Sequence, residues 1–175
     1  QVGPDLSSVD ALMLRSHKLH GETIDESVIA VARAGAGVNN IPIDEYAQRG
    51  IVVFNTPGAN ANAVKELVAA ALLLGSRDIF GGMSYVQTLG DIEDSAEMHK
   101  LLEANKKRFA GSEITGLTLG VVGLGAIGAM VANMALELGM KVAGFDPAIS
   151  IESAWRLSSR VQKVDSLQAL VGVSD

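Results

Sequence analysis

Three glycines and one acid are the residues of this sequence best suited to a chemical task. Gly123, Gly125 and Gly128 have the spacing Gly-x-Gly-x-x-Gly, and Asp146 follows at about the 20-residue distance that dinucleotide folds use. Gly123 permits a tight turn out of a strand, and Gly125 lacks the side chain that would keep a pyrophosphate from the amides at a helix start. Gly128 allows the helix and the strand to pack closely. The spacing therefore predicts a dinucleotide-binding turn.

Asp146 predicts which dinucleotide is bound. A carboxylate at this position can accept hydrogen bonds from a ribose diol, whereas a 2′-phosphate meets it as a like charge. No Arg or Lys follows before Arg156 to offset that charge. We therefore expect NAD rather than NADP. The alternative is a glycine-rich turn in an ordinary parallel sheet, because the chain contains 19 glycines and glycines recur in turns.

The elements around the motif are those that position such a site. Residues 117–122 form a short apolar run typical of a buried parallel strand, and residues 129–138 are a predicted helix that Gly139 ends. Residues 141–145 form a second strand, which leads into Asp146. This order is that of a nucleotide-binding βαβ unit. Further along we expect a helix at 151–157, a strand at 160–164 and a helix at 165–171.

The first third of the chain has the pattern of a separate small parallel sheet. Thr23 and Glu26 have the spacing of a capping box, which predicts a short helix. Pro42 suits the first turn of a second helix, which Gly50 closes. Strands are expected at residues 11–14, 28–34 and 51–54.

A long helix and a charged connector separate the two sheets. The helix runs from near Asn60 or Asn62 to about Arg77 and is apolar almost all round, so we expect it to be buried between domains or in a subunit interface. Residues 81–111 are polar and charged, which predicts a solvated helical connector. The predicted division is a partial substrate-binding domain at 1–60, the helix and connector at 61–115, and the N-terminal part of a dinucleotide domain at 116–175.

Composition narrows the classes of function. Of the 175 residues 48% are hydrophobic, and a net charge of −6 with a pI of about 5.0 argues against nucleic-acid binding. The chain has no cysteine, which excludes disulfides and thiolate catalysis. No apolar run reaches the roughly 18 residues of a membrane span, so no membrane partner and a cytoplasmic location are expected. Because the chain begins without Met and ends where a next strand is due, we expect a fragment cut at both ends.

Five segments outside the glycine motif carry a further signal. They are residues 14–16, 33–40, 55–67, 109–113 and 116–120. In this order, and over nearly the whole chain, they resemble the D-2-hydroxyacid dehydrogenase family. The resemblance implies an α/β protomer with a flavodoxin-like substrate domain followed by a Rossmann-type dinucleotide-binding domain, both partial here. It also implies that the long helix takes part in forming dimers, so a homodimer or a higher homo-oligomer is expected.

The likeness is greatest to family members that use NAD to oxidise D-3-phosphoglycerate, a small phosphorylated 2-hydroxy acid, to 3-phosphohydroxypyruvate at the start of the phosphorylated route to L-serine. By this resemblance Arg15 helps to hold the substrate phosphate, and Arg33 is a second substrate-binding arginine. The residues agree in part, since arginines at the carboxyl ends of neighbouring parallel strands lie where ligands bind. The alternative is a pair of solvent-exposed arginines at strand ends.

The resemblance assigns backbone roles as well. The loop after Arg33 would offer amides to the substrate carboxylate as an anion nest, although its last residue could be a simple turn residue. At the glycine motif, Ala126 and Ile127 would present amides to the pyrophosphate. The substrate-binding loop consists of Gly35, Ala36, Gly37, Val38 and Asn39.

The sequence departs from the family in three respects. Ala36 stands where some members carry a hydroxyl residue near the cofactor, and residues 83–108 are longer and more acidic than in many relatives. The family's catalytic arginine, glutamate and histidine lie beyond the end of this chain, so no catalytic residue is expected within it and the chain alone is expected to be inactive. His17, His20 and His99 are expected at the surface, and no metal site is expected, because the pair of histidines lacks further ligands.

Two other functions stay open at this point. One is a dehydrogenase or reductase of another small D-2-hydroxy acid, such as a glyoxylate or hydroxypyruvate reductase, for which a second cation beside Arg33 is superfluous. The other is a non-catalytic NAD-sensing protein, since the family also contains transcriptional corepressors.

Overall fold

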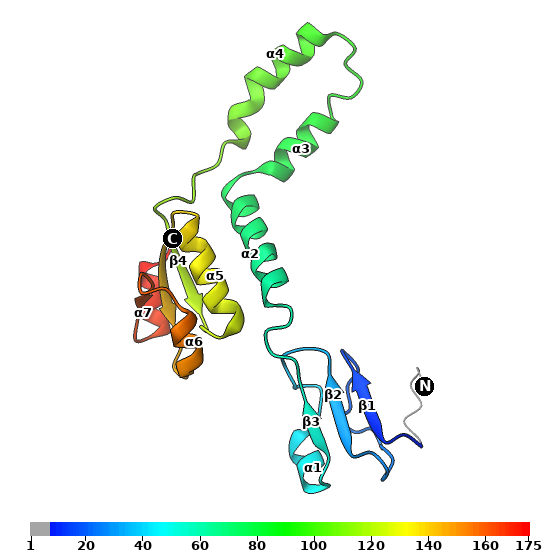
Figure 1. The fold of residues 1–175 in the computed structure, drawn as a ribbon. Helices are drawn as coiled ribbons and strands as arrows, with labels where there is room; N and C mark the ends of the chain where they lie inside the picture. The colour runs from blue at the N-terminus through cyan, green and yellow to red at the C-terminus, as the bar shows by residue number, and fades with distance from the viewer. Residues whose placement is uncertain (1–7) are drawn as a thin grey trace. The chain divides into compact units, whose positions relative to one another are not determined.

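The computed structural model describes residues 8–175, which divide into two units between Ala61 and Asn62 (Figure 1). The first seven residues of the domain predicted for 1–60 lie outside the described residues. The connector predicted for 61–115 falls almost wholly in the second unit. Each unit has its own three-stranded parallel sheet, so the predicted α/β class with two separate sheets is confirmed.

The first unit consists of β1 (Ala11–Leu14), β2 (Ala30–Arg33), α1 (Ile43–Gln48) and β3 (Val52–Phe54). β2 is the central strand, and Val31 lies in register between Leu12 and Val53. These three side chains belong to a core that includes Tyr46 of α1. Because side chains alternate across a strand, the neighbouring positions face away from that core, and Met13 is 84% exposed there. The unit therefore packs α1 and the loops against one face of its sheet.

Proline and glycine bound α1 much as the sequence predicts. Pro42 is the N-cap residue, one position before the expected first turn, and Gly50 follows the helix with φ of +73°, which favours glycine. The helix predicted from Thr23 does not form, so that prediction is wrong. Instead, one carboxylate oxygen of Asp25 accepts hydrogen bonds from the amide and the hydroxyl of Ser27, both at 3.0 Å. This local turn competes with the helix that a capping box would start.

A helical hairpin follows the long helix. The elements are α2 (Ala61–Ser76), α3 (Ile79–Gln87), α4 (Ser95–Asn105) and the 3₁₀ turn η1 (Lys106–Phe109). The hydroxyl of Tyr85 on α3 donates to the Leu101 carbonyl on α4 at 3.2 Å. The hairpin returns to the end of α2, where the Ser112 amide donates to the Ser76 carbonyl at 2.9 Å. The predicted helical connector is therefore confirmed as an excursion whose two ends meet.

Most side chains of α2 are exposed or half-buried within the described chain. Ala61 is its buried residue, whereas Leu67 is 70% exposed. The expected burial of α2 between domains or in a subunit interface stays a prediction. Among residues 8–175 no single helix is long and apolar enough to cross a membrane. α2 and α3 pass that test of length and composition only as a pair, and they are bent by 67° at the break between them.

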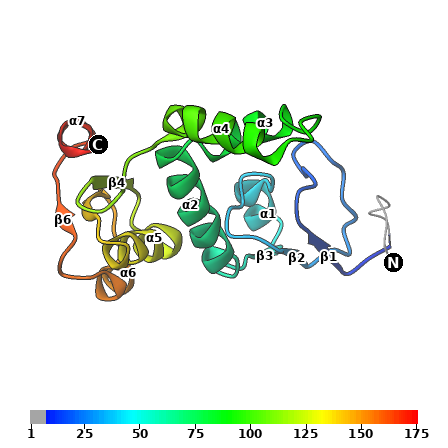
Figure 2. The ribbon, with the colours of Figure 1, turned by 90° about the horizontal axis from the view of Figure 1, so that it is seen from above.

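The second sheet is covered on both faces. Val121 of β4 lies beside Gly128 of α5, whereas Gly120 of β4 lies against Leu170 of α7. Since neighbouring residues of a strand face opposite sides, α5 and α7 cover opposite faces, as Figure 1 and Figure 2 show. The elements are β4 (Thr118–Val122), α5 (Ala126–Glu137), β5 (Lys141–Phe145), α6 (Ile151–Arg156), β6 (Gln162–Lys163) and α7 (Leu167–Val173).

The bounds of the second unit follow the sequence closely at β4 and β5. Both strands pair in parallel with Val122 opposite Phe145, so they end together. α5 begins at Ala126, three residues before the predicted start, because the second half of the glycine motif already has helical backbone. Gly139 follows α5 with φ of +82°, as expected for a glycine that ends a helix.

A buried hydroxyl in the first unit gives a stability test. Tyr46 is fully buried, and its hydroxyl has no hydrogen-bond partner among residues 8–175. We expect Tyr46→Phe to keep or raise the free energy of unfolding, by up to about 1 kcal/mol, because it removes an unpaired polar group. Tyr85→Phe is the control, and it should lower stability by about 1 kcal/mol because its hydroxyl is bonded. Urea unfolding measures both, and a loss for Tyr46→Phe would contradict the expectation.

Candidate functional site

The three glycines of the second unit are required for three different reasons. Gly123 has φ of +82°, and its amide donates to the Phe145 carbonyl at 2.8 Å, which ties the turn to the end of β5. A β-carbon added at Gly128 would lie 1.9 Å from the Gly123 carbonyl oxygen, so helix and turn are too close for a side chain. At Gly125 an added β-carbon would meet nothing within 4 Å. The space at Gly125 is thus open to a ligand.

The start of α5 presents backbone donors to that open space. Gly125 is the N-cap residue and provides no side-chain cap. Within residues 8–175 the amides of Gly125, Ala126 and Ile127 form no hydrogen bond. Unpaired amides at the positive end of a 12-residue helix attract an anion. This arrangement fits a diphosphate group.

Asp146 stands beside the glycine turn and is bonded to it. One carboxylate oxygen accepts the Leu124 amide at 2.7 Å, and the other accepts the Ala148 amide at 2.9 Å. These bonds, the Ala148 bond foremost, hold the pKa of Asp146 below its ordinary value of 3.8, so it is ionised at neutral pH. A carboxylate has about four acceptor positions, so roughly two remain for a ribose diol.

The sequence does not predict the part that Leu124 takes in this turn. Its side chain is buried and lies 2.9 Å from where a β-carbon of Gly144 would be, so Gly144 makes room for it on β5. The Leu124 side chain therefore packs against the sheet at Gly144. The signal in the sequence that could have predicted this contact is a glycine inside an apolar strand, which often marks a close approach.

Arg33 organises the loops at the carboxyl end of the first sheet. Its Nε donates to the Arg15 carbonyl at 3.0 Å, and its Nη1 donates to the Gly37 carbonyl. A β-carbon at Gly35 would lie 3.1 Å from Nη1 and one at Gly37 would lie 3.3 Å away. The loop thus wraps the guanidinium, and glycine at both positions keeps that approach possible.

The other carbonyls of this loop are held by the segment after β3. The Gly35 carbonyl accepts the Thr56 amide at 3.0 Å, and the Ala36 carbonyl accepts the Asn55 side-chain amide at 2.7 Å. Within the described residues, the amides of Ala36, Gly37 and Val38 form no hydrogen bond. Successive unpaired amides of this kind suit an anion. The sequence did not single out Asn55 and Thr56 for this purpose, although an Asn-Thr-Pro run after a strand marks a turn.

Arg15 and two of the three histidines lie near the loops of the first unit. Arg15 is exposed. The carbonyl of Asn39 accepts a hydrogen bond from Nε2 of His20 at 3.1 Å. Nε2 of His17 lies 3.9 Å from Oε1 of Glu22, and both side chains are exposed. These two histidines therefore have partners at the surface. His99, on α4, is also exposed.

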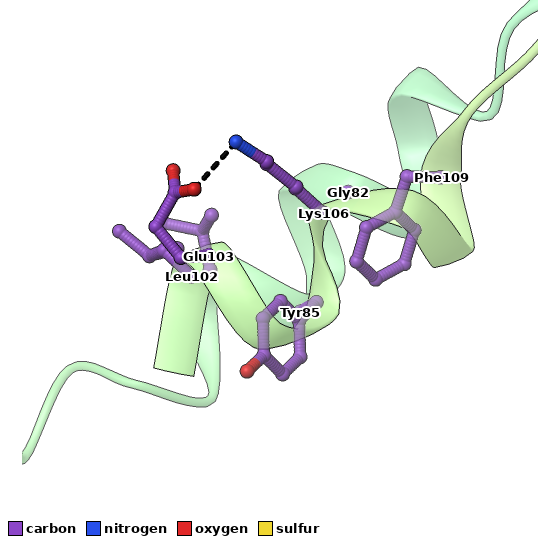
Figure 3. Close-up of a pocket in the computed structure, with 7 residues that line it drawn as sticks. Gly82, Tyr85, Leu102, Glu103, Lys106 and Phe109 are labelled. Atoms are coloured by element: carbon purple, nitrogen blue, oxygen red, sulfur yellow. Dashed lines mark hydrogen bonds and ion pairs between the residues drawn. The ribbon is translucent and has the colours of Figure 1, made fainter. Parts of the chain in front are cut away.

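A cavity in the hairpin lies outside both sets of loops (Figure 3). Its lining includes Tyr85 and Phe109, whose stacked rings have centroids 5.4 Å apart, and an ion pair between Lys106 and Glu103. The paired charges offer no free acid or base. Within residues 8–175 no three His, Asp or Glu side chains converge as metal ligands.

A family model and several curated proteins match the sequence of this chain. The family model for the catalytic domain of D-isomer specific 2-hydroxyacid dehydrogenases matches residues 1–165. The chain is 34% identical over 173 residues to the D-3-phosphoglycerate dehydrogenase of Methanocaldococcus jannaschii, which covers 97% of this chain and 30% of that protein. It is 35% identical over 183 residues to the enzyme of the same name from Mycobacterium tuberculosis, covering 95% of this chain and 31% of that protein. The chain thus spans less than a third of these curated relatives.

A solved structure gives the same comparison in three dimensions. The NAD⁺-bound 3-phosphoglycerate dehydrogenase of Entamoeba histolytica superposes with a TM-score of 0.64 at 28% identity. The match covers 97% of this chain and 45% of that one. The partial flavodoxin-like and Rossmann-type fold expected from the sequence is therefore confirmed.

Two glycine substitutions distinguish a glycine that leaves space for the ligand from one that lets the helix pack against the turn. We expect Gly125→Ala to change the free energy of unfolding by less than about 0.5 kcal/mol, since the site is open, but to weaken NAD binding at least about tenfold. Gly128→Ala should lower stability by about 1–3 kcal/mol through overpacking. Urea unfolding and calorimetric NAD titration measure the two effects. Normal NAD affinity in a folded Gly125→Ala variant would remove the role given to the open space.

The charge of Asp146 gives a selectivity test. Asp146→Ala should reduce the preference for NAD over NADP by roughly tenfold, because it removes bonds to the ribose worth about 1.5 kcal/mol and the repulsion of a 2′-phosphate. Asp165→Ala, at an exposed acid paired with Lys163, is the matched control. Dissociation constants for both dinucleotides decide the matter. Unchanged selectivity in Asp146→Ala would mean that the carboxylate only supports the turn.

Proposed function

The chain belongs to the D-isomer-specific 2-hydroxyacid dehydrogenase family, and on that premise we propose that it serves the NAD-dependent oxidation of D-3-phosphoglycerate to 3-phosphohydroxypyruvate. This reaction opens the phosphorylated route to L-serine. The observation that carries the proposal is the pair of loops with unpaired amides, each at the carboxyl end of a parallel sheet. The chain spans less than a third of its curated relatives, so the activity is proposed for the whole protein that contains it.

NAD fits the second unit by the chemistry of its donors and acceptors. The amides of Ala126 and Ile127 would bind the diphosphate, and the spare acceptor positions of Asp146 would bind the ribose diol. When bound, the nicotinamide supplies the hydride acceptor. Arg156 is the first cation after Asp146, and it is paired with Glu152, which supports NAD over NADP.

The substrate fits the first unit by charge. The amides of Ala36, Gly37 and Val38 would hold the carboxylate, and Asn39 ends the loop. Arg15 is exposed and would hold the phosphate, because guanidinium groups bind phosphate bidentately. Arg33 keeps donors beyond the two that it gives to the backbone, so it remains a candidate contact.

We propose that this chain binds but does not by itself supply the proton transfer. The reaction needs a base at the substrate hydroxyl. Of the three histidines, His20 is bonded to a loop carbonyl, His17 faces Glu22 and His99 lies on the hairpin. None of them is free beside the unpaired amides.

One observation favours a second substrate class. Arg33 gives two of its donors to backbone carbonyls, which leaves Arg15 as the exposed cation of the pair. If Arg33 makes no contact with the ligand, Arg15 alone matches an unphosphorylated acid, such as the substrate of a glyoxylate or hydroxypyruvate reductase. We retain that reaction as the alternative.

We further propose a cytoplasmic homodimer or higher homo-oligomer. Support comes from the exposed apolar residues of α2, among them Leu67 and Leu73, which a second copy would cover. Analytical ultracentrifugation of the full-length protein tests the assembly.

The first test of the reaction is a substrate comparison. The product of the complete gene should reduce NAD with D-3-phosphoglycerate far better than with D-glycerate or D-lactate. Turnover of an unphosphorylated acid alone would establish the alternative. Binding of NAD without turnover of any acid would contradict both reactions.

A substitution at Arg15 tests the phosphate contact. Arg15→Ala should lower kcat/KM for D-3-phosphoglycerate by roughly 10- to 100-fold, the effect of one or two charge-assisted hydrogen bonds. The loss with D-glycerate should stay within about threefold, since that acid has no phosphate to lose. Arg77→Ala, an exposed arginine at the end of α2, is the matched control. Equal losses for both acids would show that Arg15 is structural.

A further inference from the structure

We infer that Arg33 is a positioning residue, which holds the loop of residues 35–38 so that its amides stay available to an anion. Its guanidinium bridges two loops that follow different strands, through the Arg15 carbonyl after β1 and the Gly37 carbonyl after β2. Both bonds go to backbone, so the side chain acts on a ligand through the loop. This role deepens the substrate site proposed above.

The direction of the peptide groups explains the mechanism. A trans peptide points its carbonyl and its amide to opposite sides. The carbonyls of Gly35, Ala36 and Gly37 are all taken, by Thr56, Asn55 and Arg33 respectively. The amides that follow them therefore point the other way. Because the three carbonyls are held by hydrogen bonds within the protein, the three amides on the opposite side of these peptide groups stay available to a ligand.

Arg33 is suited to this task in a way that lysine is not. A planar guanidinium offers donors in a fixed fork, so it can hold two carbonyls at once. A β-carbon added at Gly35 or Gly37 would lie 3.1 or 3.3 Å from Nη1, so the backbone of the loop lies close to the guanidinium group. An ammonium group keeps the charge but loses the fork.

Hydrogen–deuterium exchange on the ligand-free full-length protein tests the inference without any substrate. We expect Arg33→Lys to speed exchange of the Thr56 amide at least tenfold, because its acceptor on Gly35 is released. The Ala34 amide, which donates to the Leu14 carbonyl at 2.8 Å, should stay protected and reports that the sheet is intact. Arg15→Ala is the matched control, since it removes a cation but keeps the carbonyl that Arg33 binds. It should leave Thr56 protection unchanged.

A second variant disturbs the same bonds without changing Arg33 itself. Gly37→Ala places a β-carbon against Nη1 and should also release Thr56. Thr56 exchange within twofold of wild type in both Arg33→Lys and Gly37→Ala would overturn the inference. Faster exchange in Arg15→Ala, equal to that in Arg33→Lys, would overturn it as well.

Binding of D-3-phosphoglycerate then separates this inference from the proposed function. If Arg33 acts through the loop, Arg33→Lys should weaken binding at least tenfold although the charge is kept. A loss of less than threefold would assign Arg33 a purely electrostatic contact and contradict the positioning role. If wild-type protein fails to bind the acid, the proposed substrate is wrong, while the exchange result still decides the role of Arg33.

Discussion

Both candidate sites depend on one constraint, which is that the backbone after a parallel strand must be fixed while some of its amides stay unpaired. An unpaired amide is costly in the interior and useful at a surface that receives an anion. In the first unit the loop after β2 is fixed through its carbonyls, by Arg33, Asn55 and Thr56. In the second unit the turn after β4 is fixed through the amides of Gly123 and Leu124. Each solution leaves the neighbouring amides to a ligand.

The two solutions differ in charge in a way that matches two halves of a reaction. The second unit combines unpaired amides, which can donate to a diphosphate, with the ionised Asp146, which would repel a 2′-phosphate. The first unit combines unpaired amides with Arg15 and Arg33, although the net charge of the chain is −6. On the function proposed above, the dinucleotide would bind beside an acid and the small anionic acid would bind beside two arginines. The resemblance to D-2-hydroxyacid dehydrogenases rests on both loops, not on the glycine motif alone.

Sequence patterns predicted what depends on local backbone and burial. β5 was predicted at its observed bounds, because five residues between a helix-ending glycine and an acid leave little choice. The helix at Thr23 was predicted wrongly, because the Asp25 side chain bonds to Ser27 and competes with the helical backbone. The burial expected for α2 between domains or in a subunit interface stays a prediction, since an all-round apolar sequence does not say which partner covers the helix.

The roles of Arg33 and Leu124 required coordinates. Arg33 bonds to a residue 18 positions away and Leu124 to one 22 positions away, and no spacing rule connects such pairs. Sequence placed Arg33 at the right sheet edge from its type and its position after a strand. It could not tell whether the guanidinium faces the ligand or the loop.

A crystal structure of the full-length protein with NAD and D-3-phosphoglycerate is the most direct test of the central claim. We expect diphosphate oxygens about 2.7–3.2 Å from the amides of Ala126 and Ile127, with the adenosine ribose on Asp146. We also expect the carboxylate of the acid on the amides of residues 36–38. A diphosphate bound away from the glycine turn, or an acid bound with those three amides still unpaired, would contradict the claim.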